Sequence, residues 1–231
     1  MKIKTFAVDI DGTITENGGG RIHLEALDSL RRLTNLGHNV IFVTGRSSVE
    51  AFLLSIFGGT TKMAVGENGG CITLNTNEHI LLGNLKECKD ALEILQNSIN
   101  GVKEKPVFPR LTEVVLERTF DITEAKKILS EHNSSVELSD SQYAFHINSK
   151  GIDKGFGFEK IMDKFSIKKQ DVIAIGDSAT DVPLFKKAQI SVALGNASDD
   201  VQSQATMTTK SAAGDGVLEA LDKLASKSFE F

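Results

Sequence analysis

The sequence has few of the residues typical of disulfide-rich, membrane-spanning or disordered proteins. Its 231 residues include two cysteines, three prolines, one tyrosine and no tryptophan. The two cysteines, Cys71 and Cys88, are too few for a disulfide framework and suit a reducing compartment, so we expect a cytoplasmic protein. No apolar run approaches the roughly 18 residues of a membrane helix, and Asp9 and Asp11 interrupt the apolar start. We therefore expect neither a signal peptide nor a membrane partner.

A strong excess of one charge is also absent. The formal net charge is −5, hydrophobic residues make up 40% of the chain and charged residues 25%, as in an ordinary globular protein. A mildly negative chain is a poor candidate for a broad nucleic-acid-binding surface, so we expect no nucleic-acid partner. A small phosphorylated metabolite is compatible with this charge, because its site needs only a few local cations.

Strand patterns alternate with helix patterns in the first and last thirds of the chain. Short runs of apolar and β-branched residues predict strands at 3–8, 40–43, 63–65, 172–175 and 190–193. Apolar residues at helical spacing predict helices at 23–36, 47–57, 155–165, 182–187 and 217–224. This alternation predicts an α/β fold with a doubly wound, mostly parallel sheet that is covered by helices on both faces.

The middle of the chain follows a different order. A hairpin at 71–74 and 80–82 precedes two helices and three strands, predicted at 87–99, 112–117, 123–131, 135–138 and 143–148. We interpret residues 85–151 as an inserted α+β domain, and residues 1–84 and 152–231 as one core domain. The alternative is that the middle strands extend the main sheet.

Polar residues gather where the predicted core strands end. They are Asp9-Ile10-Asp11-Gly12-Thr13, Thr44-Gly45-Arg46 and Gly176-Asp177-Ser178-Ala179-Thr180-Asp181, with Lys154 just before a helix. Each has an ordinary structural explanation: Asp11 in a turn, Asp177 as a helix N-cap, Lys154 as a surface lysine. Their joint occurrence favours a binding site, because ligands of open α/β sheets bind at the carboxyl ends of the strands.

Four carboxylates define the chemistry of this predicted site. Asp9, Asp11, Asp177 and Asp181 would lie within a few ångströms of one another, which is untenable without a cation. Hard carboxylate oxygens with no histidine or cysteine nearby select Mg²⁺, which commonly shares a phosphate oxygen.

The remaining polar residues suit a phosphate ester. Lys154 and the loop at Thr44 and Gly45 can hold phosphate oxygens. Asp9 can attack phosphorus in line and form an aspartyl-phosphate. Asp11 can protonate the leaving oxygen and then deprotonate the water that hydrolyses the intermediate.

These four motifs together resemble those of the haloacid dehalogenase superfamily of phosphatases, over the whole chain. The resemblance implies that Asp9 is the nucleophile and a magnesium ligand, and that Asp11 is the acid/base and binds the metal through its backbone carbonyl. It also implies that Asp177 and Asp181 complete the metal site and that residues 85–151 form a cap. Gly66-Glu67-Asn68-Gly69-Gly70 and Leu194-Gly195-Asn196-Ala197 resemble loops of the Cof-like subgroup.

Within that subgroup, chain length and the small cap are most similar to archaeal-type phosphoglycolate phosphatases. The resemblance therefore implies hydrolysis of 2-phosphoglycolate and suggests a homodimer. Sugar-phosphate phosphatases of the sucrose-phosphate or mannosyl-phosphoglycerate type share the same motifs and are the first alternative. A phospho-acceptor domain of the receiver type and a catalytically inactive binding protein are alternatives from other classes.

Substrate choice is expected to depend on the cap. A carboxylate-bearing substrate favours an arginine fork, and Arg110 is our candidate ahead of Arg118. Arg46 is expected to steady the loop after the second strand, and Asn196 to bond near Asp177 or Lys154. A surface role for Arg110 remains open at this point.

Overall fold

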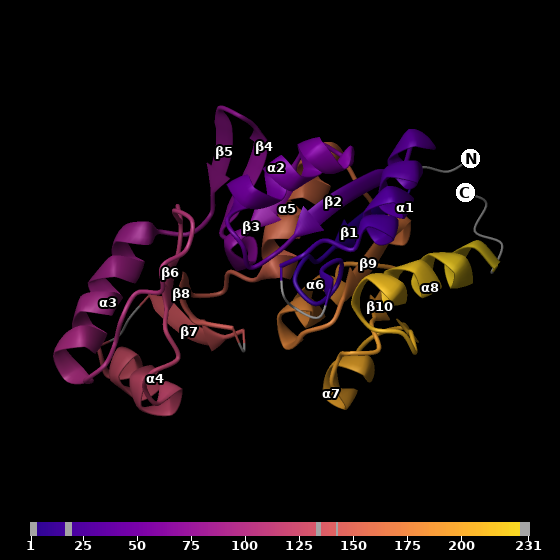
Figure 1. The fold of residues 1–231 in the computed structure, drawn as a ribbon. Helices are drawn as coiled ribbons and strands as arrows, with labels where there is room; N and C mark the ends of the chain where they lie inside the picture. The colour runs from indigo at the N-terminus through magenta and orange to yellow at the C-terminus, as the bar shows by residue number, and fades with distance from the viewer. Residues whose placement is uncertain (1–3, 17–19, 133–134, 142, 227–231) are drawn as a thin grey trace.

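The computed structural model describes residues 4–16, 20–132, 135–141 and 143–226, and it contains one large sheet and one small sheet (Figure 1). The large sheet has the strand order β11-β10-β9-β1-β2-β3-β4-β5. Its strands are β1 (Thr5–Val8), β2 (Asn39–Val43), β3 (Ala64–Gly66), β4 (Cys71–Asn75), β5 (Glu78–Leu81), β9 (Val172–Gly176), β10 (Ile190–Ala193) and β11 (Met207–Thr208). Neighbours from β11 to β3 run parallel, whereas β4 and β5 add an antiparallel edge.

Helices cover both faces of this sheet, as the alternating pattern predicts. One face packs against α1 (Leu24–Asn35), α2 (Ser48–Gly58) and α8 (Ala213–Ser226), and the other against α5 (Lys154–Phe165), α6 (Val182–Phe185) and α7 (Asp199–Gln202). Side chains of β1 alternate between the two cores: Phe6 and Val8 face the first and Ala7 the second. The predicted doubly wound α/β fold is confirmed.

The small sheet belongs to the inserted segment. Its elements are α3 (Leu85–Ser98), β6 (Val114–Leu116), α4 (Ile122–Glu131), β7 (Val136–Asp140) and β8 (Phe145–Ser149), and its antiparallel strand order is β6-β8-β7. A third apolar core lies between this sheet and its two helices. Figure 1 shows these elements beside the large sheet, so the alternative that they extend it is wrong. The domain boundaries at 84/85 and 151/152 stay a prediction.

Smaller features of the fold differ from the prediction. The strand expected at 143–148 begins at Phe145, and the helix expected at 182–187 ends at Phe185. The short elements β11 and α7 are unpredicted, because two to four residues carry no readable periodicity. Residue 3 of the strand predicted at 3–8 lies outside the described part of the chain.

Two observations bear on the expected surroundings of the protein. Cys71 and Cys88 are buried and unpaired, and burial raises the pKa of their thiols to about 11 and about 12. Within the described ranges, no helix combines the length and the apolar character that crossing a bilayer requires.

Candidate active site

The carboxyl ends of β1, β2 and β9 lie side by side near the centre of the large sheet. β1 is the switch point of the topology, because β2 follows it on one side and β9 returns on the other. The backbone N–H of Asp9 donates to the carbonyl oxygen of Ile175 at 3.0 Å and extends the pairing of β1 and β9. Asp9, Thr44 and Asp177, each the first residue after its strand, therefore start from one edge.

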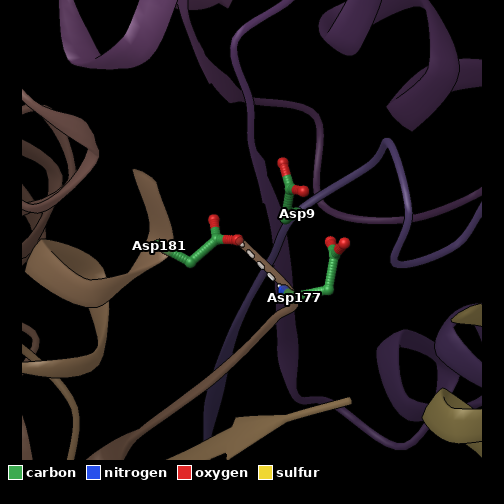
Figure 2. Close-up of side chains that lie close together, drawn as sticks. All are labelled: Asp9, Asp177 and Asp181. Carbon is green, nitrogen blue, oxygen red and sulfur yellow. Dashed lines mark hydrogen bonds between the residues drawn. The ribbon is translucent and has the colours of Figure 1, made fainter. Parts of the chain in front are cut away.

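Three carboxylates form one cluster at this edge (Figure 2). One oxygen of each of Asp9, Asp177 and Asp181 lies within 4.8 Å of the other two. Asp181 is fixed by a capping turn, in which its Oδ2 accepts from the backbone N–H groups of Asp177 at 3.1 Å and Ser178 at 2.9 Å. The structure thus brings together three of the four predicted acidic residues.

Lys154 supplies the positive charge of the cluster. Its Nζ donates to Oδ1 of Asp9 at 2.8 Å and to Oδ1 of Asp181 at 2.7 Å. Asp153 caps α5 by accepting from the N–H of Phe156, which places Lys154 in the first turn with only 3% of its side chain exposed. Because a buried ammonium is costly without partners, the surface explanation for Lys154 is wrong.

Three carboxylates surround this one ammonium. Burial and then the charge of Asp181 raise the pKa of Asp9 well above its ordinary value, and the same causes raise the pKa of Asp177 to about 6. Burial opposes the charge of Lys154, but Asp181 and Asp9 outweigh it and its pKa lies above the ordinary value. A further cation in the cluster would oppose both causes, because it would favour the charged forms of Asp9 and Asp177.

Two side chains hold Asp177 in place. Thr13 Oγ1 donates to its Oδ1 at 2.9 Å, and Asn196 Nδ2 donates to its Oδ2 at 2.9 Å, which confirms the predicted contact of Asn196. Gly12 lies against the same carboxylate with φ of 79°, and a Cβ atom there would be 2.3 Å from Oδ2. Both the backbone conformation and the close approach therefore require glycine.

The loop after β2 is fixed by its own backbone. The N–H of Thr44 donates to the carbonyl oxygen of Val65 at 2.9 Å, and the carbonyl oxygen of Thr44 accepts from the N–H of Asn68 at 3.1 Å. The buried hydroxyl of Thr44 accepts from the N–H of Arg46 at 3.1 Å, so its proton can serve a ligand oxygen.

Asp11 departs from the predicted arrangement. Its side chain is 42% exposed and pairs with Arg46, through Oδ2 to Nε at 2.7 Å and Oδ1 to Nη2 at 2.8 Å. This bond to Asp11 is the main cause that raises the pKa of Arg46 above its ordinary value. The expectation that all four carboxylates share one cluster is wrong, because Arg46 holds the carboxylate of Asp11 outside the group formed by Asp9, Asp177 and Asp181.

Arg110 reaches the core from the segment that precedes β6. Its Nη1 donates to the carbonyl oxygen of Gly45 at 2.7 Å and to Glu113 Oε1 at 2.9 Å, and 9% of its side chain is exposed. The surface alternative for Arg110 is therefore wrong. His146 on β8 is also buried, and its Nδ1 lies 3.0 Å from Glu113 Oε2.

Comparison of the sequence with protein families identifies the family of this chain. A model of the haloacid dehalogenase-like hydrolases matches residues 6–103 and 96–221. The chain belongs to the haloacid dehalogenase-like hydrolase family.

Curated relatives and solved structures of other proteins match this hydrolase over nearly its whole length. A protein of Nitrosopumilus maritimus named phosphoglycolate phosphatase is 77% identical over 225 residues, which cover 97% of each chain. One of the same name from Methanosarcina mazei is 35% identical over 98% of each chain. A crystal structure from Thermoplasma acidophilum matches with a TM-score of 0.86 and 21% identity, covering 97% of this chain and 99% of that one. At that identity the match bears on the fold.

The acidic cluster of this hydrolase fits a divalent cation. Its three carboxylate oxygens are hard ligands with the close spacing that a small cation needs, and no thiol or imidazole belongs to the group among the described residues. The raised pKa values of Asp9 and Asp177 fit the same interpretation, because a cation would favour their charged forms.

The Arg46–Asp11 pair predicts that Arg46 is a positioning residue of this hydrolase. We expect Arg46→Lys to lower kcat about 10- to 100-fold with little change in KM, because lysine cannot form the two-point bond that orients Asp11. Steady-state kinetics would measure kcat and KM of the variant and of the wild type. Arg32→Lys, at an exposed two-point pair with Asp28 on α1, is the matched control and should leave both constants unchanged. An unchanged kcat in Arg46→Lys would contradict the positioning role.

Several residues of this hydrolase site carry little signal of their role in the sequence. Glu113 carries no motif and gives no signal beyond its place in a predicted strand. Glu67 and Asn68 lie in a sequence that shows only a loop resemblance, and in the structure Gly66 and Gly69 on either side of them approach other backbone segments closely. Arg46 was expected to steady its own loop, and its bond to Asp11 across the site gave no local signal.

Proposed function

We propose that this hydrolase is a magnesium-dependent phosphomonoesterase that converts 2-phosphoglycolate to glycolate and phosphate. The observation that carries the substrate is the 77% identity, over nearly the full length of both chains, to a relative named phosphoglycolate phosphatase. The small cap, with two helices and a three-stranded sheet, supports a small organic phosphate as substrate.

In the first step, a carboxylate oxygen of Asp9 attacks phosphorus while the ester P–O bond breaks. Oδ1 of Asp9 is held by Lys154, so the side chain is already oriented by the buried pair. Asp11 donates a proton to the oxygen of the leaving glycolate. The products of this step are glycolate and an aspartyl-phosphate on Asp9.

In the second step, water attacks the phosphorus of the aspartyl-phosphate. Asp11, now ionised, takes the proton from this water, and the bond between phosphorus and Asp9 breaks to release phosphate. Asp11 therefore acts first as acid and then as base. While it carries the proton, one of its two bonds to Arg46 must open, and the other keeps the side chain oriented.

Phosphate binding is assigned to Lys154 and to the loop at Thr44 and Gly45. The Lys154 ammonium and the Thr44 hydroxyl are donors for non-bridging oxygens. Asp9 and Asp177 would hold Mg²⁺ together with the carbonyl of Asp11, and Asp181 would support it from its capping turn. The bound metal would neutralise charge on the phosphate during attack.

The test is release of phosphate from a panel of phosphorylated metabolites, with Mg²⁺ and after chelation with EDTA. We expect 2-phosphoglycolate to give the highest kcat/KM, loss of nearly all activity on chelation, and recovery when Mg²⁺ is restored. A higher kcat/KM for sucrose phosphate or mannosyl-phosphoglycerate would favour the sugar-phosphate alternative. Full activity in EDTA would refute the metal requirement.

A homodimer and a cytoplasmic location stay predictions. Sedimentation of the purified chain would test the first, and fractionation of the source cells the second. The receiver-type and inactive-protein alternatives find no support in the family to which the chain belongs.

A further inference from the structure

The guanidinium of Arg110 is only partly used by the protein. Nη1 makes both of its bonds within the described chain, to Gly45 and Glu113, whereas the buried Nε has no hydrogen-bond partner there. Buried donors are rarely left without an acceptor, because they lose their bonds to water. The Nε edge of an arginine is one of the two edges that bind a carboxylate with two parallel bonds.

Glu113 accepts from Nη1 of this guanidinium, which does not belong to the Nε edge. Its side chain is 1% exposed, and its Oε2 lies 3.0 Å from Nδ1 of His146 and 3.4 Å from Nδ2 of Asn68. The carboxylate of Glu113 is thus engaged on both oxygens and fixes Nη1 alone. The pair orients Arg110 without occupying its Nε.

Glu67 fixes the backbone that carries Arg110. Oε2 of Glu67 accepts from the N–H groups of Leu111 at 2.9 Å and Thr112 at 2.7 Å, and from the Thr112 hydroxyl at 2.7 Å. These are the two residues between Arg110 and Glu113. A core side chain therefore sets the position of the cap segment that bears the arginine.

This polar cluster adjoins the phosphate-binding loop. Arg110 bonds the carbonyl of Gly45, and a Cβ atom on Gly45 would lie 3.1 Å from Oδ1 of Asn68. Asn68 in turn bonds the backbone of Thr44. Arg110 therefore lies beside the loop to which phosphate binding is assigned.

We propose that Arg110 binds the carboxylate of the substrate through its Nε edge, and that Glu113 and Glu67 are the positioning residues that hold it ready. This proposal rests on the proposed function and names the groups that select its substrate. By this one guanidinium the protein distinguishes phosphorylated carboxylic acids from phosphate monoesters of the same size that carry no carboxylate.

The test compares 2-phosphoglycolate with ethyl phosphate, which has a methyl group in place of the carboxylate. In the wild type we expect kcat/KM to favour 2-phosphoglycolate by roughly 10- to 100-fold. Arg110→Lys and Glu113→Gln should remove most of this preference by raising KM for 2-phosphoglycolate about tenfold more than KM for ethyl phosphate. Arg118→Lys, at a cap arginine that pairs with Asp140 at 2.8 Å, is the matched control.

The outcomes separate this proposal from the proposed function. Equal losses on both esters would mean that Arg110 only joins cap and core, and would overturn the proposal. The wild-type comparison decides the matter if a variant does not fold, because equal kcat/KM values for the two esters would also overturn it. A wild type that hydrolyses ethyl phosphate but not 2-phosphoglycolate would overturn the substrate and this proposal. One that hydrolyses neither ester nor any metabolite of the panel would overturn the phosphatase activity itself.

Discussion

We expect Asp9→Asn to lower kcat by at least about 10⁴-fold, because an amide oxygen is a poor nucleophile and cannot form a stable acyl-phosphate. The variant should fold normally. Its side-chain oxygen can still accept from Lys154, and it removes one negative charge from a cluster whose burial raises the pKa of Asp9. The measurements are phosphate release from 2-phosphoglycolate and the melting temperature, which should stay within a few degrees of the wild type.

Asp90→Asn is the matched control for this loss. Asp90 lies on α3 in an exposed pair with Lys86, and its replacement should leave kcat and KM unchanged. In the wild type, mass spectrometry of a quenched reaction should find a phosphoryl group on the peptide that contains Asp9. Activity of Asp9→Asn within tenfold of the wild type would contradict the nucleophile assignment.

The main part of the site was predictable because it is built on strand ends. The runs that became β2 and β9 are continuously apolar at 40–43 and 172–175, and β1 ends with Phe6-Ala7-Val8, as expected for strands buried on both faces. In a parallel sheet such strands must all end at one edge, so the polar residues after them meet wherever the strands are neighbours. The positions of Asp9, Thr44 and Asp177 follow from that rule.

Other contacts depend on geometry that the sequence does not show. Asp11 is the third residue after β1, in a turn, and its partner Arg46 lies 35 residues further along the chain, so the choice between the metal cluster and Arg46 is not visible in the sequence. Two carboxylates where the cap meets the core, Glu67 of the core and Glu113 of the cap, are almost fully buried, contrary to the usual exposure of glutamate. Their partners come from distant parts of the chain, so only the assembled fold reveals them.

The Arg46–Asp11 and Lys154–Asp9 pairs place the two aspartates of the proposed reaction in different surroundings. Asp11 is half-exposed and paired at the surface of the cluster, which suits a group that must exchange protons with substrate and water. Asp9 is buried and paired with an ammonium, which aligns its carboxyl group, and a bound cation would favour the charged form that the attack requires. The different surroundings of the two aspartates therefore support their different proposed roles.

Lys154→Met should lower kcat/KM by about 10²- to 10³-fold, because it removes the only ammonium bonded to Asp9 within the described chain. It should also destabilise the fold by about 3–5 kcal/mol, since two buried carboxylates, Asp9 and Asp181, lose their shared partner. Thermal unfolding and kinetics with saturating Mg²⁺ would measure both effects. A metal cannot donate the hydrogen bonds of an ammonium, so extra Mg²⁺ should not restore the rate.

The matched control is Lys187→Met, which breaks a pair of similar length in a different environment. Lys187 Nζ lies 2.6 Å from Glu159 Oε1, but both side chains are partly exposed to solvent. Water screens such a pair, so its loss should cost at most about 1 kcal/mol and leave kcat/KM unchanged. If Lys154→Met behaved like Lys187→Met in both measurements, the ammonium would be dispensable, and neither the stability of the acidic cluster nor phosphate binding could depend on it.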